Sequence, residues 1–244
     1  MRILLFHGVV PDSYTDLPPK HITESRFREV LDTLDDVFAC KDIDINNLPT
    51  GQAITFDDGY WNNYEVAWPI LKEYGFPWTI FLTTGFIGTD RVIWTDKLRA
   101  LLADPPDDVY DIISRWHKGY SELPDFDYDP MLSKFVTWDQ VREMNEDPMV
   151  DFGAHTVNHV SCGQVPDDVC EKEIWNSLVK LCKEGLLTDP PLFAFPEGQP
   201  SDINGHAENT LDDFARIQRI KFAFAATKEW TSPNRYRLPR EMIC

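Results

Sequence analysis

Short apolar runs alternate with longer amphipathic segments along this chain, and that alternation limits its fold more than any other feature. Strands that alternate with helices form βα units, which assemble into a parallel sheet or barrel. The runs are too widely spaced for a β-sandwich, so we predict an α/β fold. The expected strands are Ile3–Phe6, Ala53–Phe56, Trp78–Leu82, Val150–Gly153, Leu192–Phe195 and Phe222–Ala226.

The segments between these runs carry signals for helices. The expected helices are one capped by Thr23, one over Asn63–Tyr74, one over Trp138–Asn145 capped by Thr137, one from Asp167 to about Gly185, and one over Leu211–Lys221. A threonine caps a helix by accepting a hydrogen bond from a backbone N–H group of the first turn. Proline has no backbone N–H, so Pro69 predicts a kink or a later start of the second helix.

The stretch from about Asp90 to Lys134 differs from the rest of the chain. It is rich in aspartate and proline, yet it also holds several leucine and isoleucine residues. We interpret it as an insertion on a barrel, part helix and part loop, that serves as a lid or as half of an oligomer interface. It does not read as a second domain, so residues 1–244 are expected to form a single domain.

Composition excludes several classes of partner. The chain has 244 residues, a length ordinary for one α/β barrel, and 43% of them are hydrophobic, enough for a large core. No apolar run approaches the ~20 residues of a transmembrane helix, and the first residues lack the pattern of a signal peptide. The net charge of −18 argues against nucleic acid and anionic membranes as partners.

The cysteines indicate a redox compartment. They are Cys40, Cys162, Cys170, Cys182 and Cys244, an odd number without paired spacing. We interpret them as free thiols of a reducing compartment, and together with the first residues of the chain they predict a cytoplasmic location.

Two polar motifs follow apolar runs. Asp57 and Asp58 precede Gly59 at the end of one run, and His155 and His159 lie at the end of another. One carboxylate and two imidazoles form a set of metal ligands that leaves positions open for water and substrate. The second carboxylate is then free to act as a base. The four-residue spacing of the histidines predicts that both lie on one side of a helical turn.

Taken singly, each motif has a plainer interpretation. Asp-Asp-Gly is commonly a turn, and a lone His-x-x-x-His is commonly surface or capping chemistry. Active sites of parallel barrels, however, gather at the carboxyl ends of the strands. Because both motifs, together with His7 and Glu197, follow apolar runs, the sequence favours one shared site.

The motifs resemble those of the polysaccharide deacetylase family, which has the NodB-homology or carbohydrate esterase 4 fold. The similar segments are Thr55–Gly59, His155–His159 downstream, Phe193–Gly198 for the third motif in the form Phe-Ala-Tyr-Pro-Tyr-Gly, and Leu5–His7 for the Tyr-His of that subgroup. The resemblance covers nearly the whole chain. It implies a distorted (β/α) barrel of seven or eight strands and metal-dependent hydrolysis of an N-acyl group on an amino sugar.

The resemblance also implies roles for the matching residues. Asp57 matches the catalytic base, and Asp58, His155 and His159 match the ligands of one divalent metal ion. Zinc is the favoured ion, and cobalt, nickel, iron and manganese also suit such a site. His7 is the candidate general acid, with a buried histidine at the barrel rim as the alternative.

Two departures from the family pattern concern the base and the substrate. The third motif lacks its usual arginine. Arg240 lies in a Pro-Arg ending similar to that of the subgroup, and it is the candidate to bind Asp57 instead. The alternative is that Arg240 is a surface arginine. Glu197 replaces a tyrosine whose backbone N–H helps to hold the oxyanion, and that backbone donor survives the change. Further candidates for substrate binding are Pro196, Trp61 and Trp94. Core packing is the alternative for each tryptophan.

These observations predict a cytoplasmic, metal-dependent amide hydrolase that removes an acetyl or formyl group from an amino sugar. A small-molecule or lipid-linked precursor is the expected substrate, in the biosynthesis of a surface polysaccharide. Two alternatives stay open. One is a catalytically silent sugar-binding or regulatory relative, which is suggested by Glu197 and by the missing motif arginine. The other is an amidase that acts on a non-sugar molecule.

Overall fold

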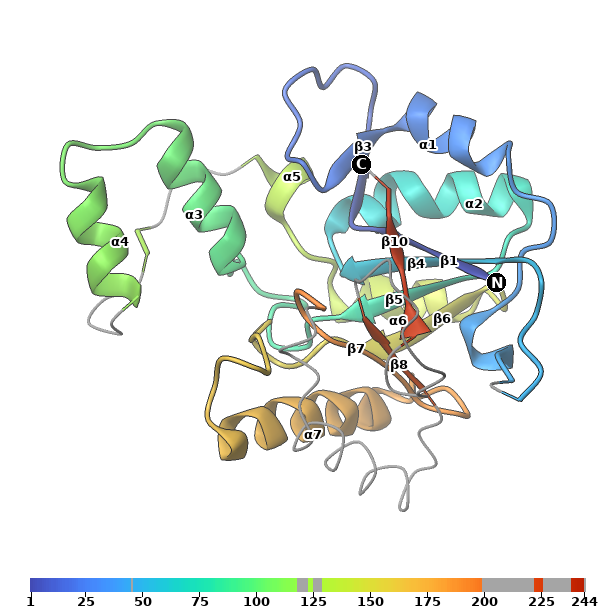
Figure 1. Cartoon of the computed structure of the whole chain (residues 1–244). Helices are drawn as coiled ribbons and strands as arrows, with labels where there is room; N and C mark the ends of the chain where they lie inside the picture. The colour runs from blue at the N-terminus through green and yellow to red at the C-terminus, as the bar shows by residue number, and fades with distance from the viewer. Residues whose placement is uncertain (45, 118–122, 125–128, 199–221, 226–237, 244) are drawn as a thin grey trace.

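A computed structural model describes residues 1–44, 46–117, 123–124, 129–198, 222–225 and 238–243 of the chain. Within these residues, eight parallel strands form one sheet in the order β10-β1-β4-β5-β6-β7-β8-β9 (Figure 1). The strands are β1 (Arg2–Phe6), β4 (Gln52–Asp58), β5 (Trp78–Leu82), β6 (Val150–Ala154), β7 (Leu192–Ala194), β8 (Phe222–Ala225), β9 (Leu238–Pro239) and β10 (Glu241–Met242). Each of the six predicted runs forms one of these strands, and Ala226 alone lies outside the described residues.

The last residues of the chain nearly close this sheet into a barrel. β9 pairs with β8 at one edge of the sheet, whereas β10 pairs with β1 at the other edge. Arg240 stands between the two short strands, and its backbone N–H donates to the carbonyl oxygen of Ala225 at 3.0 Å. On the other side, the N–H of Ile243 donates to the carbonyl oxygen of Leu5 at 2.9 Å. The predicted distorted α/β barrel is therefore confirmed.

The helices that surround the sheet follow the predicted segments. They are α1 (Glu24–Leu31), the π-helix η2 (Asn63–Ala67), α2 (Trp68–Tyr74), α6 (Trp138–Asn145) and α7 (Asp167–Glu184). Thr137 and Gln140 exchange side chain to backbone bonds in a capping box, which confirms the predicted start of α6. Pro69 lies in the first turn of α2, so the α-helix starts late, as predicted. The predicted helix over Leu211–Lys221 lies outside the described residues.

Two short strands and a 3-10 helix were not expected from the sequence. β2 (Gly8–Val10) and β3 (His21–Thr23) pair in parallel, and η1 (Cys40–Asp42) precedes β4. Gly8 pairs with His21, so the residues just before them, His7 and Lys20, lie side by side at the carboxyl end of β1. Strands of this length carry no periodic signal that sequence analysis could detect.

The strands separate two hydrophobic clusters. The larger one joins the strands to the surrounding helices, for example Phe56 of β4 to Phe27 of α1 and Ile174 of α7. The smaller one consists of Ile3, Cys40, Ile43, Ala53, Phe81, Leu192, Ala194, Phe224 and Leu238. Successive side chains of a strand face opposite sides, so the smaller cluster fills the interior of the barrel.

The predicted insertion carries three helices: α3 (Trp94–Ala103), α4 (Val109–His117) and α5 (Pro130–Ser133). Figure 1 shows α3 and α4 projecting away from the barrel, whereas α5 lies close to it. None of the helices in the described part of the chain combines the length and the apolar character that crossing a membrane requires.

Candidate metal and catalytic site

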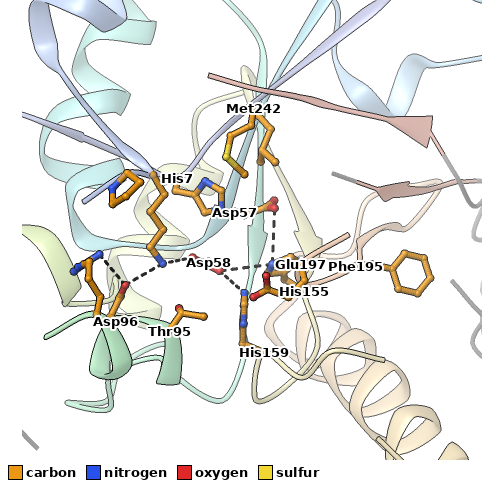
Figure 2. Close-up of a pocket in the computed structure, with 14 residues that line it drawn as sticks. His7, Asp57, Asp58, Thr95, Asp96, His155, His159, Phe195, Glu197 and Met242 are labelled. Carbon is orange, nitrogen blue, oxygen red and sulfur yellow. Dashed lines mark hydrogen bonds and ion pairs between the residues drawn. The ribbon is translucent and has the colours of Figure 1, made fainter. Parts of the chain in front are cut away.

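The predicted site residues meet at the carboxyl end of the barrel (Figure 2). Asp57 lies near the end of β4, and His155 directly follows β6. Because side chains alternate along a strand, Asp57 shares the interior face with Ala53 of the inner cluster. The same alternation turns His7, after β1, and Arg240, after β9, toward the interior.

His7, Asp57 and His155 line a cavity of ≈ 410 Å³. Its lining comprises Leu5, His7, Pro19, Lys20, Asp57, Asp58, Thr95, Asp96, Arg99, His155, His159, Phe195, Glu197 and Met242. The cavity thus joins the first strand, all three motifs, the insertion and the C-terminal strand. Its volume lies within the range of sites for small molecules.

Three candidate metal ligands converge in this cavity. Single ligand atoms of Asp58, His155 and His159 lie within 4.8 Å of one another, and all three residues are buried. Oδ1 of Asp58 lies 3.6 Å from Nε2 of His155 and 3.2 Å from Nε2 of His159. Within the described residues, this buried oxygen accepts no hydrogen bond. A carboxylate oxygen that faces two imidazole nitrogens and lacks a donor fits a divalent cation.

The protonation of the two histidines also suits a metal. Nδ1 of His155 lies 2.9 Å from the carbonyl oxygen of Ala194, so Nδ1–H donates and Nε2 keeps its lone pair. Burial lowers the pKa of His155 to about 4, so its ring is neutral near pH 7. Burial also disfavours protonation of His159, but the Asp58 carboxylate raises the pKa of His159 above its ordinary value. Cation binding would therefore displace a proton from His159.

Asp57, the second carboxylate, is held by Arg240. Nη1 and Nη2 of Arg240 lie 2.6 and 2.7 Å from Oδ1 and Oδ2 of Asp57, in a bidentate ion pair. Arg240 is only 1% exposed, so the alternative of a surface arginine is wrong. Burial raises the pKa of Asp57, but the charge and hydrogen bonds of Arg240, together with the neighbouring His155 and His7, outweigh that effect and bring the pKa below its ordinary value. The carboxylate is therefore ionised at neutral pH and able to accept a proton.

His7 lies in the same cavity beside both carboxylates (Figure 2). Burial lowers the pKa of His7, and the charges of Asp58 and Asp57 oppose that shift. Nδ2 of Asn63 donates to the carbonyl oxygen of His7 at 2.8 Å, which fixes the backbone after β1. The ring lines the cavity, so a proton from it can reach a ligand there.

The histidine loop is not the helical turn that its spacing predicts. Residues 155–159 contain no helix, and Thr156 and His159 have φ values of 62° and 55°. Positive φ is unfavourable for residues with a side chain, so surrounding contacts must hold this backbone. The prediction was wrong because a four-residue spacing alone does not distinguish a helical turn from a loop.

Glu173 of α7 holds this loop, although no motif in the sequence marks this residue. The carboxylate of Glu173 accepts from the backbone N–H of Val157 at 2.9 Å and from that of Asn158 at 2.8 Å. The side-chain amide of Asn158 donates to its other oxygen at 2.6 Å. A buried carboxylate with three donors is a rigid anchor for the segment between the two histidines.

Glu173→Gln is expected to weaken zinc binding by about 10- to 100-fold, the usual effect of removing a residue that orients a ligand. The neutral amide loses the charge-assisted bonds and turns one donor toward the loop N–H groups. Equilibrium dialysis measures the change. Glu171→Gln, on the exposed side of the same helix, is the matched control and should bind as the wild type does. Equal affinities for all three proteins would show that the loop does not depend on Glu173.

Of the four residues predicted to bind substrate, only Glu197 is among the described residues that line the cavity. Its φ is 60°, and its side chain is exposed. Pro196 is buried and is not among the residues that line the cavity. The ammonium of Lys134 lies 5.5 Å from the ring centre of Trp61. Trp94 packs against the larger hydrophobic cluster. For Trp94 this contact favours the alternative of core packing.

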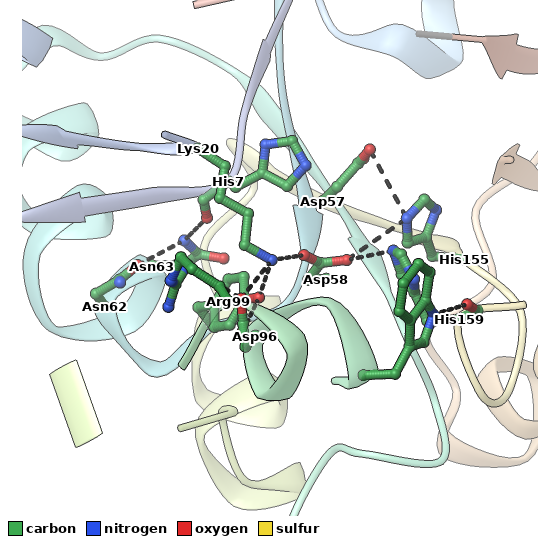
Figure 3. A network of polar contacts seen from close by, with 12 residues as sticks. His7, Lys20, Asp57, Asp58, Asn62, Asn63, Asp96, Arg99, His155 and His159 are labelled. Atoms are coloured by element: carbon green, nitrogen blue, oxygen red, sulfur yellow. Dashed lines mark hydrogen bonds and ion pairs between the residues drawn. The ribbon is translucent and has the colours of Figure 1, made fainter. Parts of the chain in front are cut away.

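Charged residues that the sequence did not reveal complete the cavity. They are Lys20, Asp96 and Arg99, and Figure 3 shows them beside the candidate metal ligands. Lys20 comes from the loop before β3, and the other two come from the inserted helix α3. Neither segment carries a motif, so only the fold shows that they reach the site.

Comparison with known proteins identifies the family. Residues 49–212, more than half of the chain, match the polysaccharide deacetylase family. The chain therefore belongs to that family, as its motifs indicated, and this membership indicates a hydrolase.

Individual relatives agree with this assignment. A stretch of 48 residues is 42% identical to the protein YxkH of Bacillus subtilis (strain 168), and it spans 20% of this chain and 17% of that protein. The de-N-acetylase from Aggregatibacter actinomycetemcomitans has a similar structure, with a TM-score of 0.66, 20% identity, and coverage of 98% of this chain and 93% of that chain. The Streptococcus pyogenes deacetylase PplD in complex with acetate gives a TM-score of 0.63, 19% identity, and coverage of 100% and 92%. At these identities, the structural likeness establishes the fold.

Proposed function

We propose that this chain is a metal-dependent deacylase that removes an acetyl or formyl group from the nitrogen of an amino sugar. The observation that carries the proposal is the convergence of Asp58, His155 and His159 beside a fourth residue, Asp57, whose carboxylate is ionised. Three ligands and a separate base are the parts that hydrolysis by an activated water requires. All of them belong to the single domain that we propose for residues 1–244.

A divalent ion held by Asp58, His155 and His159, with zinc as the first choice, would lower the pKa of a water molecule and polarise the amide carbonyl. Asp57 accepts the proton of the attacking water, and Arg240 holds both of its oxygens in place for that role. The backbone N–H of Glu197 is the proposed donor to the oxyanion. His7 gives a proton to the departing nitrogen.

The substrate that we propose is an N-acylated amino sugar in the synthesis of a surface polysaccharide, either a polymer or a small or lipid-linked precursor. The family acts on polysaccharides, and the two structural relatives are named as a de-N-acetylase and as a deacetylase bound to acetate. Acetyl is therefore the first acyl group to test. We also propose a cytoplasmic location, because an odd number of cysteines without paired spacing favours a reducing compartment.

Arg240 also bears on the catalytically silent alternative. That alternative rested in part on the arginine that is missing from the third motif, and the bidentate pair with Asp57 supplies an arginine from the last strands. The base and its partner are both in place, which favours an enzyme over a binding protein.

The proposal is tested by incubating the zinc-loaded protein with N-acetyl and N-formyl amino sugars, as monosaccharides, nucleotide sugars and oligosaccharides. Release of acetate or formate, with one free amine for each, is the expected result. The same protein treated with a chelator should release neither. If the zinc-loaded protein binds these sugars without cleaving them, the silent alternative replaces our proposal. If it cleaves only simple amides, the non-sugar amidase does.

A further inference from the structure

Lys20 contacts the carboxylate that we assign to the metal, yet the proposed reaction gives it no role. Its Nζ lies 3.3 Å from Oδ2 of Asp58, and its side chain is only 17% exposed. A lysine is rarely buried without a partner, because desolvation of the ammonium is costly. This ion pair therefore indicates a specific function at the site.

The two oxygens of Asp58 have different surroundings (Figure 3). Oδ1 faces Nε2 of His159 at 3.2 Å and Nε2 of His155 at 3.6 Å. Oδ2 faces the ammonium of Lys20 instead. A cation held by the two histidines would thus meet Oδ1, while Lys20 occupies the other oxygen.

Lys20 is itself held from the opposite side. Its Nζ lies 3.2 Å from Oδ1 of Asp96 and forms a hydrogen bond with the hydroxyl of Tyr60. That hydroxyl donates to Oδ2 of Asp96 at 2.6 Å, and Arg99 lies 3.3 Å from Oδ1 of Asp96. Asp96 is 1% exposed and belongs to the inserted helix α3. A buried network in which each polar group has a partner fixes the position of the ammonium.

We infer that Lys20 is a positioning residue that limits Asp58 to one metal-binding oxygen. The inference rests on the proposed function. A carboxylate can bind a cation through one oxygen or through both. Binding through both would fill a position that a catalytic site must leave open for water or substrate. Lys20 prevents this by holding Oδ2, and the insertion contributes by holding Lys20 through Asp96.

Lys20→Met tests the inference in the cobalt-substituted protein. The variant should keep one metal ion per chain and bind it more tightly, because a nearby positive charge is lost and Oδ2 becomes available. Its cobalt absorption should weaken, since Co²⁺ absorbs less strongly when its coordination number rises. We expect kcat for the N-acetyl sugar to fall by about 10- to 100-fold. Lys20→Arg keeps the charge and should restore the intense spectrum in part.

Two further variants keep the test decisive. Tyr60→Phe removes one partner of Lys20 without removing a charge, so it should show the same changes to a smaller extent and serves if Lys20→Met fails to fold. Lys41→Met removes another lysine paired to a buried aspartate, Asp151 at 2.8 Å, and should leave both the spectrum and kcat unchanged.

The outcomes separate this inference from the proposed function. An active wild type together with an unchanged cobalt spectrum in Lys20→Met and Tyr60→Phe overturns the inference alone. Loss of the metal from Lys20→Met also overturns the inference, because this result would mean that the wild-type lysine is needed to keep the ion bound, not to limit its coordination. A wild type that binds no metal overturns both.

Discussion

Replacing Asp57 with asparagine is expected to lower kcat by about 10²- to 10⁴-fold and to leave the metal content unchanged. The asparagine side chain has the same shape as aspartate but accepts no proton from the attacking water. Position 57 does not supply any of the three candidate ligands, so the cation stays bound. The measurement is acetate release by the zinc-loaded variant, alongside its zinc content.

The stability of this variant needs a separate control. Asp57 neutralises Arg240, which is buried, and a neutral partner leaves that charge only partly compensated. We expect the melting temperature to fall by several degrees while the protein stays folded. A folded, zinc-loaded Asp57→Asn protein with wild-type activity would show that another group is the base, and the assignment of Asp57 would fail.

The alternation of strands and helices could be predicted because most elements are long enough to show their period. Thr137 and Gln140 even mark the start of α6 to the residue. The strands that close the barrel could not be predicted, since β9 and β10 have two residues each. Their place depends on pairing with β8 and β1, which are distant in sequence.

The residues of the site also divide into those that the sequence could predict and those that it could not. The motif residues Asp57, Asp58 and His155 follow apolar runs, and strand ends in a parallel barrel meet at one rim. Lys20 and Glu173 could not be found in this way, because each acts on a motif through a contact between distant segments. The spacing of the histidines was also misleading, since a positive φ at Thr156 can be recognised only in the folded loop.

Removing two ligands together, in Asp58→Ala/His155→Ala, is expected to abolish stoichiometric zinc binding and, with it, acetate release. Each residue supplies one of the three converging ligand atoms, so the loss should exceed the roughly 10- to 100-fold effect of a residue that only orients a ligand. Elemental analysis after dialysis should find about one zinc per wild-type chain and none in the variant.

Asp151→Ala is the matched control for this loss, because Asp151 is a buried aspartate at the opposite end of β6, 7% exposed and paired with Lys41. It should keep its zinc even if its melting temperature falls. If the double variant retains zinc, the ion is held elsewhere in the chain. If the wild type itself takes up neither zinc nor cobalt nor nickel, the hydrolytic mechanism fails, and a sugar-binding role becomes the better account of this cavity.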